Sequence, residues 1–297
     1  MKNVLLIINP ISGRQTIEKK IDGILDIFKK NNIDVHTEQT QFRGHATQMA
    51  KAAFENGYDT LICCGGDGTL NEVFTGLLES GHNKEIKLGY LPCGSTNDFA
   101  DTLGLNIDPI AQTRNILNEK IMPMDVGKFG DDKFFSYISC FGAFSDSSYS
   151  APQKLKNHVG HFAYILEGLK DFWHIKPTEG RIIVDGEEFS GKFAFGSVSN
   201  TKSVAGIVKL KDDIVNLEDG LFEVILVRYP KNIFNLLKIV FMAKTSNFSS
   251  DDFILRRAKK IECEFNRDIP WSLDGEKAEP GKSVVIENYS KAIDLLK

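Results

Sequence analysis

The sequence has few cysteines, no long hydrophobic run and no excess of positive charge. Its five cysteines among 297 residues are an odd number, and none forms a C-x-x-C pair. This argues against a disulfide scaffold and against a paired-cysteine metal site. No apolar run approaches the roughly 18–20 residues needed to cross a bilayer. The first residues enter a strand-like segment without a signal-peptide cleavage pattern. We therefore expect a cytoplasmic protein.

The charge balance argues against a nucleic-acid partner. There are 36 basic and 40 acidic residues, for a net charge of −4, whereas proteins that bind duplex nucleic acid usually carry a clustered basic excess. Apolar residues make up 42% and charged residues 26% of the chain, as in ordinary globular proteins. The length suits two domains of roughly 100–200 residues. The one unusual count is phenylalanine, with 21 residues.

Residues 1–125 alternate between buried strands and amphipathic helices. Continuous apolar runs predict strands at residues 4–8, 33–37, 60–64 and 87–91, and helical spacing predicts helices over 17–28, 46–55 and 70–77. Such alternation is typical of a parallel sheet covered by helices. The loops at 9–13, 65–69 and 92–98 all follow predicted strand ends. We expect them to meet at one edge of the sheet, where open α/β sheets bind ligands.

From residue 126 onward short strands dominate, many of them paired across turn dipeptides such as Asp185-Gly186. Helices are expected at 158–173 and 231–242; the second is apolar on nearly all sides, which leaves core packing and a membrane-contact surface both open. The fold class predicted is α/β, with an open α/β domain at 1–125 and an antiparallel β-sandwich at 126–288. Residues 289–297 are expected to pack back on the first domain.

The loop Gly65-Gly66-Asp67-Gly68-Thr69 is the first candidate ligand site. Its glycines let backbone amides approach an anion closely, and the following helix adds the positive end of its dipole. Asp67 is available for a metal or a ligand hydroxyl. An ordinary tight turn accounts for this spacing equally well. The loop is neither a Walker A motif nor the G-x-G-x-x-G fingerprint of dinucleotide sites.

The loop at 92–98 provides a second carboxylate, Asp98, before a helix that opens at Phe99. Asp98 is either an N-cap or a group that holds Mg²⁺ on a nucleotide, since Mg²⁺ typically takes one or two carboxylates plus phosphates. The segment Asn9–Gly13 alone could be a bare turn. Three such loops at one edge of a sheet together favour a phosphate site.

Four motifs resemble the diacylglycerol kinase catalytic family, which includes soluble bacterial lipid kinases and their sphingosine- and ceramide-kinase relatives. They are Asn9–Gly13, Gly44-His45-Ala46, Gly65–Val73 and Pro92–Ala100. The resemblance runs from residue 3 to about residue 287. The G-G-D-G-T loop by itself is less specific, because NAD kinases and phosphofructokinases have a similar one.

The resemblance implies that ATP binds along the three loops and at Thr40. Ser95 stands where the family usually has threonine, and it retains the hydroxyl. The nucleotide-binding residues implied are Asn9, Pro10, Ile11, Ser12, Gly13, Thr40, Gly65, Gly66, Asp67, Gly68, Thr69, Asn71, Glu72, Gly94, Ser95, Asn97 and Asp98.

The resemblance also implies a structural Mg²⁺ site at Asp219-Gly220-Leu221-Phe222. Asp219 would hold the ion with the backbone carbonyls of Asn216 and Leu221. The Pro-x-Ala usual upstream is Asp213-Ile214-Val215 here, so this loop departs from the family pattern. A plain hairpin turn explains Asp219 equally well.

The family's catalytic base lies in an Asp-Gly-Glu motif, which occurs twice in this chain, at 185–187 and 274–276. The family base follows a late helix and strand, which matches Glu276, and we treat Glu187 as part of an exposed turn. Glu276 would accept the proton of a lipid hydroxyl as it attacks the γ-phosphate, and Asp67 would hold Mg²⁺ at the phosphates.

The resemblance thus implies an ATP-dependent lipid kinase that acts on diacylglycerol or a related lipid alcohol and visits the inner face of the membrane. A NAD kinase-like phosphotransferase and a non-catalytic lipid- or nucleotide-binding protein are the alternatives. The sequence does not choose among lipid acceptors, and a homodimer is left open. The phenylalanine excess suits either a lipid cleft or the core of the sandwich.

Overall fold

The computed structural model describes residues 1–12, 17–94, 97–143, 176–201, 203–204, 208–210, 214–245, 248 and 250–297. The chain forms two compact units. The first comprises Met1–Tyr137, Asn216–Leu221 and Asn288–Lys297, and the second comprises Ile138–Val215 and Phe222–Glu287. The expected helix at 158–173 lies outside the described residues.

The first unit is built on a parallel sheet. Its strands are β1 (Asn3–Ile8), β2 (Asp34–Gln39), β3 (Thr60–Gly65), β4 (Lys87–Pro92) and the last residues of β15 (Glu276–Leu296). Their order is β2-β1-β3-β4-β15, and each neighbouring pair is parallel. Asp294–Leu296 pairs with Lys87–Gly89, so the end of the chain adds the fifth strand. The antiparallel pair β5 (Ile121–Phe129) and β6 (Lys133–Phe135) follows.

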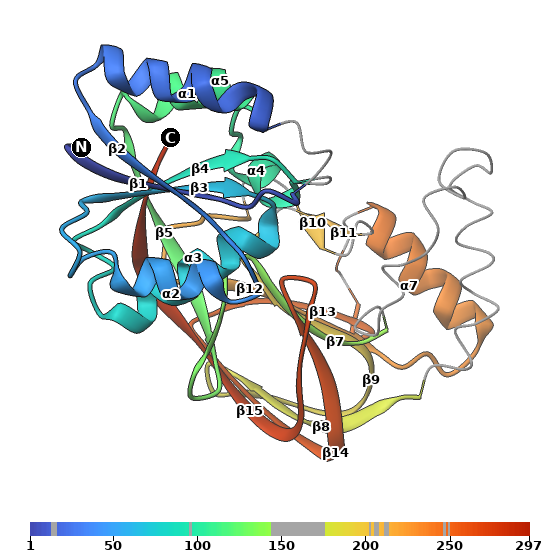
Figure 1. The fold of residues 1–297 in the computed structure, drawn as a ribbon. Helices are drawn as coiled ribbons and strands as arrows, with labels where there is room; N and C mark the ends of the chain where they lie inside the picture. The colour runs from blue at the N-terminus through green and yellow to red at the C-terminus, as the bar shows by residue number, and fades with distance from the viewer. Residues whose placement is uncertain are drawn as a thin grey trace. The chain divides into compact units, whose positions relative to one another are not determined.

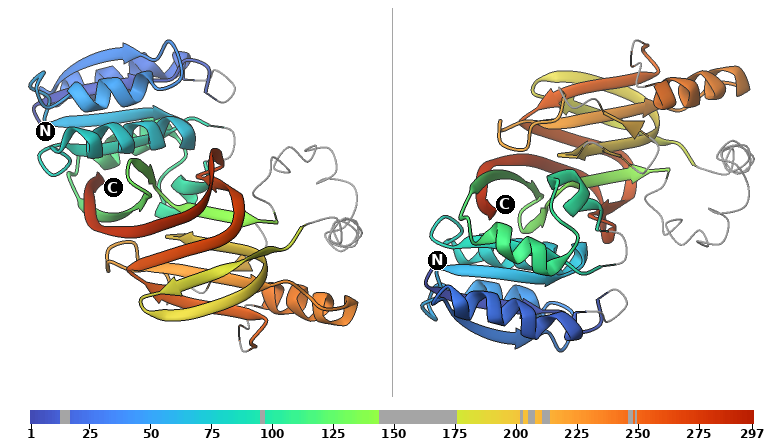
Figure 2. Two further views of the ribbon diagram at one scale, coloured as in Figure 1. Left: turned by 90° about the horizontal axis from the view of Figure 1, so that it is seen from below. Right: turned by 90° about the horizontal axis from the view of Figure 1, so that it is seen from above.

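Helices cover both faces of this sheet (Figure 1). α1 (Glu18–Lys30) and α5 (Pro109–Ile116) lie on one face, and α2 (His45–Ala52) and α3 (Asp67–Ser80) lie on the other; Figure 2 shows the arrangement from below and from above. Alternate residues of each strand enter the two cores: Leu6 packs with α1, and Leu5 packs with α2 and α3. The short helix α4 (Asp98–Leu103) follows β4. The apolar runs are continuous because both faces are buried.

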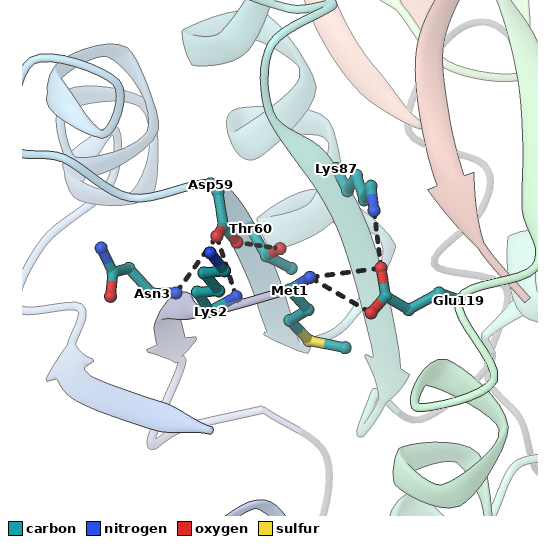
Figure 3. A network of polar contacts seen from close by, with 7 residues as sticks. All are labelled: Met1, Lys2, Asn3, Asp59, Thr60, Lys87 and Glu119. Carbon is teal, nitrogen blue, oxygen red and sulfur yellow. Dashed lines mark hydrogen bonds and ion pairs between the residues drawn. The ribbon is translucent and has the colours of Figure 1, made fainter. Parts of the chain in front are cut away.

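A polar network joins the amino-terminal ends of the parallel strands (Figure 3). Asp59 Oδ2 accepts hydrogen bonds from the backbone amides of Lys2 (2.8 Å) and Asn3 (3.2 Å). Glu119 receives the Met1 ammonium at 3.1 Å and Lys87 Nζ at 2.6 Å. This end of the sheet is thus held by side chains, whereas its opposite end carries the glycine-rich loops.

Gly76 allows α2 and α3 to pack closely. A Cβ added at Gly76 would lie 2.3 Å from the Thr47 carbonyl oxygen and 2.8 Å from Ala50 Cβ. We expect Gly76→Ala to destabilise the first unit by about 1–3 kcal/mol, because the backbone of α2 would have to move. Differential scanning calorimetry should show a lower melting temperature.

Gly23→Ala in α1 is the matched control for that substitution. A Cβ at Gly23 would meet only Ile110 Cδ1, at 2.9 Å, and this side-chain end can rotate away. Alanine also gains about 1 kcal/mol of helix propensity over glycine. We expect Gly23→Ala to be neutral or stabilising; an equal loss of stability in both variants would contradict the close-packing argument.

The second unit consists of antiparallel strands. They are β7 (Ile138–Gly142), β8 (Thr178–Val184), β9 (Glu187–Ser199), β12 (Phe222–Arg228), β13 (Phe253–Ala258), β14 (Lys260–Leu273) and the first part of β15, with the small pair β10 (Ser203–Val204) and β11 (Val208–Lys209). The order β13-β12-β9-β7-β14 forms one run, and β8 pairs with both β9 and β14. α7 (Ile233–Thr245) is its one helix among the described residues.

Aromatic side chains fill the interior of the second unit. Phe141 lies 4.9 Å from Trp271 and 5.1 Å from Phe265, measured between ring centroids, with edge-on geometry in both pairs. Trp271 and Phe141 are almost fully buried. Part of the phenylalanine excess therefore serves the core of this unit.

The predicted fold class is confirmed: an α/β part precedes a β-sandwich-like part. No helix among the described residues combines the length and the apolar character that a membrane span requires.

Candidate active site

The strand order of the first unit creates a switch point between β1 and β3. The chain passes from β1 to β2 on one side and then to β3 on the other. In doubly wound sheets, ligands bind just beyond the carboxyl ends of the strands at such a point. The loop after β1 begins with Asn9, and the loop after β3 contains Gly66 and Asp67. Both loops therefore flank the expected ligand position.

Asn9 connects the two loops across the switch point. Its backbone amide donates to the Cys64 carbonyl at 2.9 Å, and its side-chain amide donates to Thr69 Oγ1 at 2.8 Å. Asn9 Oδ1 accepts the Ile11 amide at 3.1 Å. Ser12 Oγ accepts the Gly66 amide at 3.3 Å. These bonds hold the first loop in place against the glycine-rich turn.

The glycine-rich loop also touches the loop after β4. A Cβ at Gly94 would lie 2.8 Å from Gly66 Cα, so neither position has room for a larger residue without a backbone shift. The Cys93 amide donates to the Gly65 carbonyl at 2.8 Å. The three loops thus form one connected edge, as the sequence predicts for ligand-binding loops of an α/β sheet.

Asp67 is the first residue of α3 and is half-buried. The Tyr90 hydroxyl donates to Asp67 Oδ1 at 3.3 Å. Burial, followed by the charge of Asp67, raises the pKa of Tyr90, so the phenol keeps its proton and remains a donor. A carboxylate at a helix N-terminus is also favoured by the helix dipole. The Tyr90 hydroxyl and the start of α3 therefore hold the Asp67 side chain in a fixed position.

The Glu72 side chain binds the backbone at the start of α2. Its two carboxylate oxygens accept the backbone amides of Gly44 (2.9 Å) and Ala46 (3.2 Å), and the Glu72 carbonyl accepts Thr47 Oγ1 at 3.0 Å. The Gly44-His45-Ala46 motif and the glycine-rich motif are therefore one structural unit. The prediction that Glu72 contacts the nucleotide stays untested; its visible bonds give it a positioning role.

Two candidate residues carry buried amide oxygens that have no hydrogen-bond partner in the described part of the chain. These atoms are Asn71 Oδ1 on α3 and Asn97 Oδ1 at the start of α4. An unsatisfied buried acceptor costs about 1–3 kcal/mol. Both amides lie in motifs that the sequence singled out, and a ligand with hydrogen-bond donors would satisfy them.

An apolar hollow of about 230 Å³ lies beside the first loop. It is lined by Ile8, Pro10, Ile17, Ile21 and Gln39. Thr40 follows Gln39 directly, and its backbone amide donates to the Ile8 carbonyl at 2.8 Å. The hollow is thus an apolar space next to the first loop of the connected edge.

Asp125 is a buried carboxylate that the sequence did not indicate as a site residue. Its Oδ2 accepts the Gly220 amide at 2.6 Å, and its Oδ1 accepts the Lys291 amide at 2.7 Å. Its own amide donates to the Leu217 carbonyl at 2.8 Å. Burial raises the pKa of Asp125, and these hydrogen bonds oppose the rise.

The predicted metal loop lies against Asp125. Asn216 Oδ1 accepts the Glu218 amide at 3.2 Å, and Asp219 Oδ1 accepts the Leu221 amide at 3.1 Å. The oxygen donors here are those that Mg²⁺ prefers. Among the described residues, no three His, Cys, Asp or Glu side chains gather closely enough to hold a metal. Backbone carbonyls and water would therefore have to complete any coordination shell.

Both Asp-Gly-Glu motifs are two-residue hairpin turns in the second unit. Asp185 and Gly186 join β8 to β9, and Asp274 and Gly275 join β14 to β15; all four have positive φ angles. This matches the type I′ turn that such dipeptides favour. The turn geometry alone therefore does not distinguish Glu187 from Glu276.

The surroundings of the two glutamates differ. Arg256 binds Glu187 through two hydrogen bonds of 2.7 and 2.8 Å. Glu276 is exposed and follows Asp274, which is buried and exchanges two hydrogen bonds with Ile138, through its amide (2.8 Å) and its carboxylate (2.9 Å). Glu187 thus serves an ion pair with Arg256, and Glu276 directly follows a turn that Asp274 anchors to Ile138.

Three predicted site residues are incompletely described. Gly13 and Ser95 lie outside the described residues, and Asp98 is placed only as the first residue of α4. Asn97, rather than Asp98, occupies the N-cap position of α4. The N-cap alternative for Asp98 is therefore wrong; the chain reaches the helix one residue earlier through the left-handed conformation of Asn97.

Comparisons with known proteins agree on one family. Residues 3–129 match the model of the diacylglycerol kinase catalytic domain, and residues 146–296 match that of the YegS C-terminal NAD kinase beta sandwich-like domain. A Bacillus subtilis protein named diacylglycerol kinase is 32% identical over 93% of this chain and 90% of its own length. A Staphylococcus carnosus protein of the same name is 32% identical over 93% of this chain and 89% of its own length.

Solved structures share the fold. A crystal structure of a diacylglycerol kinase from Bacillus anthracis str. Sterne has a TM-score of 0.76 at 24% identity and covers 99% of this chain and 96% of that chain. Another structure from the same strain has a TM-score of 0.79 at 23% identity and covers 99% of this chain and 95% of that chain.

Proposed function

The chain belongs to the diacylglycerol kinase catalytic family, and on that premise we propose that it transfers the γ-phosphate of ATP to the hydroxyl of a lipid alcohol, with diacylglycerol as the first candidate. It is a kinase enzyme. The observation that carries the proposal is the connected edge formed by the Asn9, Gly66 and Gly94 loops at the β1–β3 switch point.

We assign nucleotide binding to residues 1–125. The apolar hollow beside Pro10 would receive the adenine ring, and the backbone amides of the glycine-rich loop would receive phosphate oxygens. The buried oxygens of Asn71 and Asn97 add acceptors for a hydroxyl or amino group of the ligand. Residues 126–288 would carry the lipid site and the base, with residues 289–297 as part of the first unit.

Phosphoryl transfer needs little covalent chemistry from the protein, so positioning and charge stabilisation dominate. Glu276 would accept the proton of the lipid hydroxyl as that oxygen attacks the γ-phosphorus. Asp67, fixed by the Tyr90 hydroxyl and the start of α3, would hold Mg²⁺ at the phosphates, where the ion neutralises developing negative charge. Asp98 is the second carboxylate proposed there.

A structural Mg²⁺ at the Asp219 loop is proposed separately. The ion would be held by the Asp219 carboxylate and by the carbonyls of Asn216 and Leu221. Asp125 supports this assignment, since a buried carboxylate next to the loop is stabilised by a neighbouring cation. The role would be to fix the 216–221 segment of the first unit.

We expect Mg²⁺ to raise the melting temperature of the wild-type protein without nucleotide. A ligand at a hundred times its dissociation constant stabilises the folded state by about 2.7 kcal/mol. Asp219→Ala should abolish most of this Mg²⁺-dependent shift, measured by thermal scanning with and without millimolar Mg²⁺. Asp131→Ala, in the exposed β5–β6 turn, is the control and should keep it. An unchanged shift in Asp219→Ala would place the ion elsewhere.

The proposed reaction is tested with labelled ATP and a panel of acceptors: diacylglycerol, phosphatidylglycerol, ceramide, sphingosine and undecaprenol. We expect transfer to diacylglycerol, giving phosphatidic acid. Adding NAD to the panel tests the NAD kinase-like alternative. Transfer to none of these acceptors, together with retained nucleotide binding, would favour a non-catalytic binding protein.

The proposed substrate also sets where the enzyme works. Diacylglycerol resides in a bilayer, so a cytoplasmic enzyme without a membrane-spanning helix among its described residues would act peripherally at the inner face. The net charge of −4 opposes approach to an anionic leaflet. A local surface of the protein must then provide the attraction.

A further inference from the structure

The helix α7 presents apolar side chains to solvent as well as to the core. Its inner face, formed by Leu236, Ile239, Met242 and Ala243, is buried in the second unit. On its outer face the exposed fractions are 79% for Phe234, 45% for Leu237 and 65% for Phe241. These three positions follow the i, i+3, i+7 spacing of one helix face. Burial in the second unit therefore does not account for the apolar outer face.

This outer face concentrates exposed apolar area. Of the eleven large hydrophobic residues that are exposed in the described part of the chain, four lie on α7, with Ile233 as the fourth. The helix lies at the margin of the second unit, visible in orange in Figure 2. A contiguous exposed apolar patch on a protein marks a surface for a partner or a membrane.

The rim of this patch is basic. A hollow of about 1,100 Å³ beside α7 is lined by four cationic side chains, Lys192, Arg228, Lys231 and Lys238, and by two carboxylates, Asp251 and Asp252. Lys238 pairs with Asp252 at 3.4 Å, and Arg228 donates to the Asp251 and Ser190 carbonyls. The cations outnumber the carboxylates here, in contrast to the acidic whole chain.

We propose that α7 inserts its Phe234–Leu237–Phe241 face into the surface of an anionic lipid membrane, with the surrounding lysines and arginine against the phosphate headgroups. This inference rests on the proposed lipid substrate. An interfacial helix with an apolar face and basic flanks binds lipid in this way, and each cation near an anionic surface strengthens the attraction. A second copy of the chain is a poorer occupant, because a two-fold interface would bring two basic rims together.

The test measures membrane binding without ATP or acceptor. The wild-type protein should sediment with vesicles of phosphatidylglycerol and phosphatidylcholine, and less with phosphatidylcholine alone. The double variant Phe234→Glu/Phe241→Glu should bind anionic vesicles at least tenfold more weakly while keeping its melting temperature. Ile107→Glu, which changes a 73% exposed residue of the first unit, is the matched control and should bind as the wild type does.

Activity separates this inference from the proposed function. The double variant should keep its kcat on a dispersed short-chain diacylglycerol and lose activity on diacylglycerol in vesicles. Wild-type binding to vesicles without any lipid phosphorylation would overturn the proposed function but support α7 docking. Equal vesicle binding by the wild type and the double variant would overturn α7 docking. If, in addition, the wild type is a dimer and the double variant a monomer, the apolar face of α7 is a contact between two copies of the chain.

A second observation concerns two cysteines at the base of the phosphate loops. Cys64 is the penultimate residue of the buried strand β3, and Cys93 follows β4; their sulfur atoms lie 3.2 Å apart. Cys64 immediately precedes Gly65-Gly66, and Cys93 immediately precedes Gly94, whose backbone touches Gly66. Cys64 is buried and Cys93 is half-buried. The hydrogen bond between the two sulfur atoms lowers the pKa of Cys93.

We propose that hydrogen peroxide converts Cys64 and Cys93 into a reversible disulfide that weakens nucleotide binding. The Cys93 thiolate attacks the peroxide oxygen and becomes a sulfenic acid, with release of water; the Cys64 thiol then displaces a second water to form the S–S bond. A disulfide requires the sulfurs to approach to about 2.05 Å. Because Cys93 adjoins Gly94, this approach of the sulfur atoms would shift the backbone at the Gly66–Gly94 contact. There is no free space at that contact, so the shift would distort the loops.

Intact mass measurement after mild peroxide treatment should show the loss of two hydrogens, and peptide mapping should join Cys64 to Cys93. ATP affinity should fall severalfold and return with dithiothreitol. Cys64→Ser should be insensitive, whereas Cys140→Ser, which removes a buried cysteine of the second unit, should respond as the wild type does. No Cys64–Cys93 link, or a link that leaves ATP affinity unchanged, would overturn the proposal.

Discussion

Replacing Glu276 with glutamine is expected to lower kcat by about 10²–10⁴-fold, the range that a general base contributes. Glutamine retains the size and polarity of the side chain but cannot take a proton from a lipid hydroxyl. Nucleotide affinity should remain unchanged, because nucleotide binding is assigned to the loops of the first unit. The measurement is single-turnover phosphorylation of diacylglycerol, with ADP or ATP binding measured separately.

The fold should tolerate this substitution. Glu276 is exposed and follows a type I′ turn whose conformation depends on Asp274 and Gly275. Asp274 fixes that turn through its hydrogen bonds with Ile138. Glu276 is therefore an exposed residue next to a turn that is fixed from the inside, which suits a base that must be held in position.

Glu187→Gln is the matched control, since it alters the same tripeptide in the other hairpin. Its carboxylate pairs with Arg256 at an exposed site, so the change should affect stability little and kcat not at all. A large loss of kcat in Glu187→Gln with wild-type kcat in Glu276→Gln would exchange the two roles. Wild-type kcat in both variants would mean that neither Glu187 nor Glu276 is the catalytic base.

Local patterns were enough to predict the α/β part of the fold. Strands buried on both faces require continuous apolar runs, and β1 and β3 have them. Two hairpins of the second unit turn at Asp-Gly dipeptides, which readily adopt the left-handed conformation that a type I′ turn needs. The pairing of β15 with β4 joins residues 294–296 to residues 87–89. Such register depends on contacts across some 200 residues, and no local pattern encodes it.

In the candidate site, too, local patterns predicted some residues, and others became apparent only in the folded structure. Glycine spacing and chain order marked the loops at 65–69 and 92–98 as candidates, because close backbone approach requires glycine. Asp125 was not predicted, since one aspartate in a strand has no local signal; only the fold brings the amides of Gly220 and Lys291 to it. Glu72 was expected to bind nucleotide, yet its bonds to α2 become apparent only in three dimensions.

The second large effect is expected at Asp67. We expect Asp67→Asn to lower kcat/KM by about 10³-fold, since a carboxylate that holds Mg²⁺ at the phosphates supports several kcal/mol of charge stabilisation and each 1.36 kcal/mol is a factor of ten. Asparagine is nearly isosteric, and its carbonyl oxygen can still accept the Tyr90 hydroxyl. The fold and the α3 N-terminus should therefore persist, which circular dichroism and the melting temperature would verify.

Tyr90→Phe separates the charge of Asp67 from its positioning. It removes the 3.3 Å hydrogen bond but leaves the carboxylate, so the expected loss in kcat/KM is no more than about tenfold, in line with one ordinary hydrogen bond. The Mg²⁺ dependence of ATP binding decides between the two effects: it should disappear in Asp67→Asn and remain in Tyr90→Phe. If Asp67→Asn binds ATP with unchanged Mg²⁺ dependence and turns over normally, then the ion at the phosphates is held by other residues, and Asp98 becomes the next position to test.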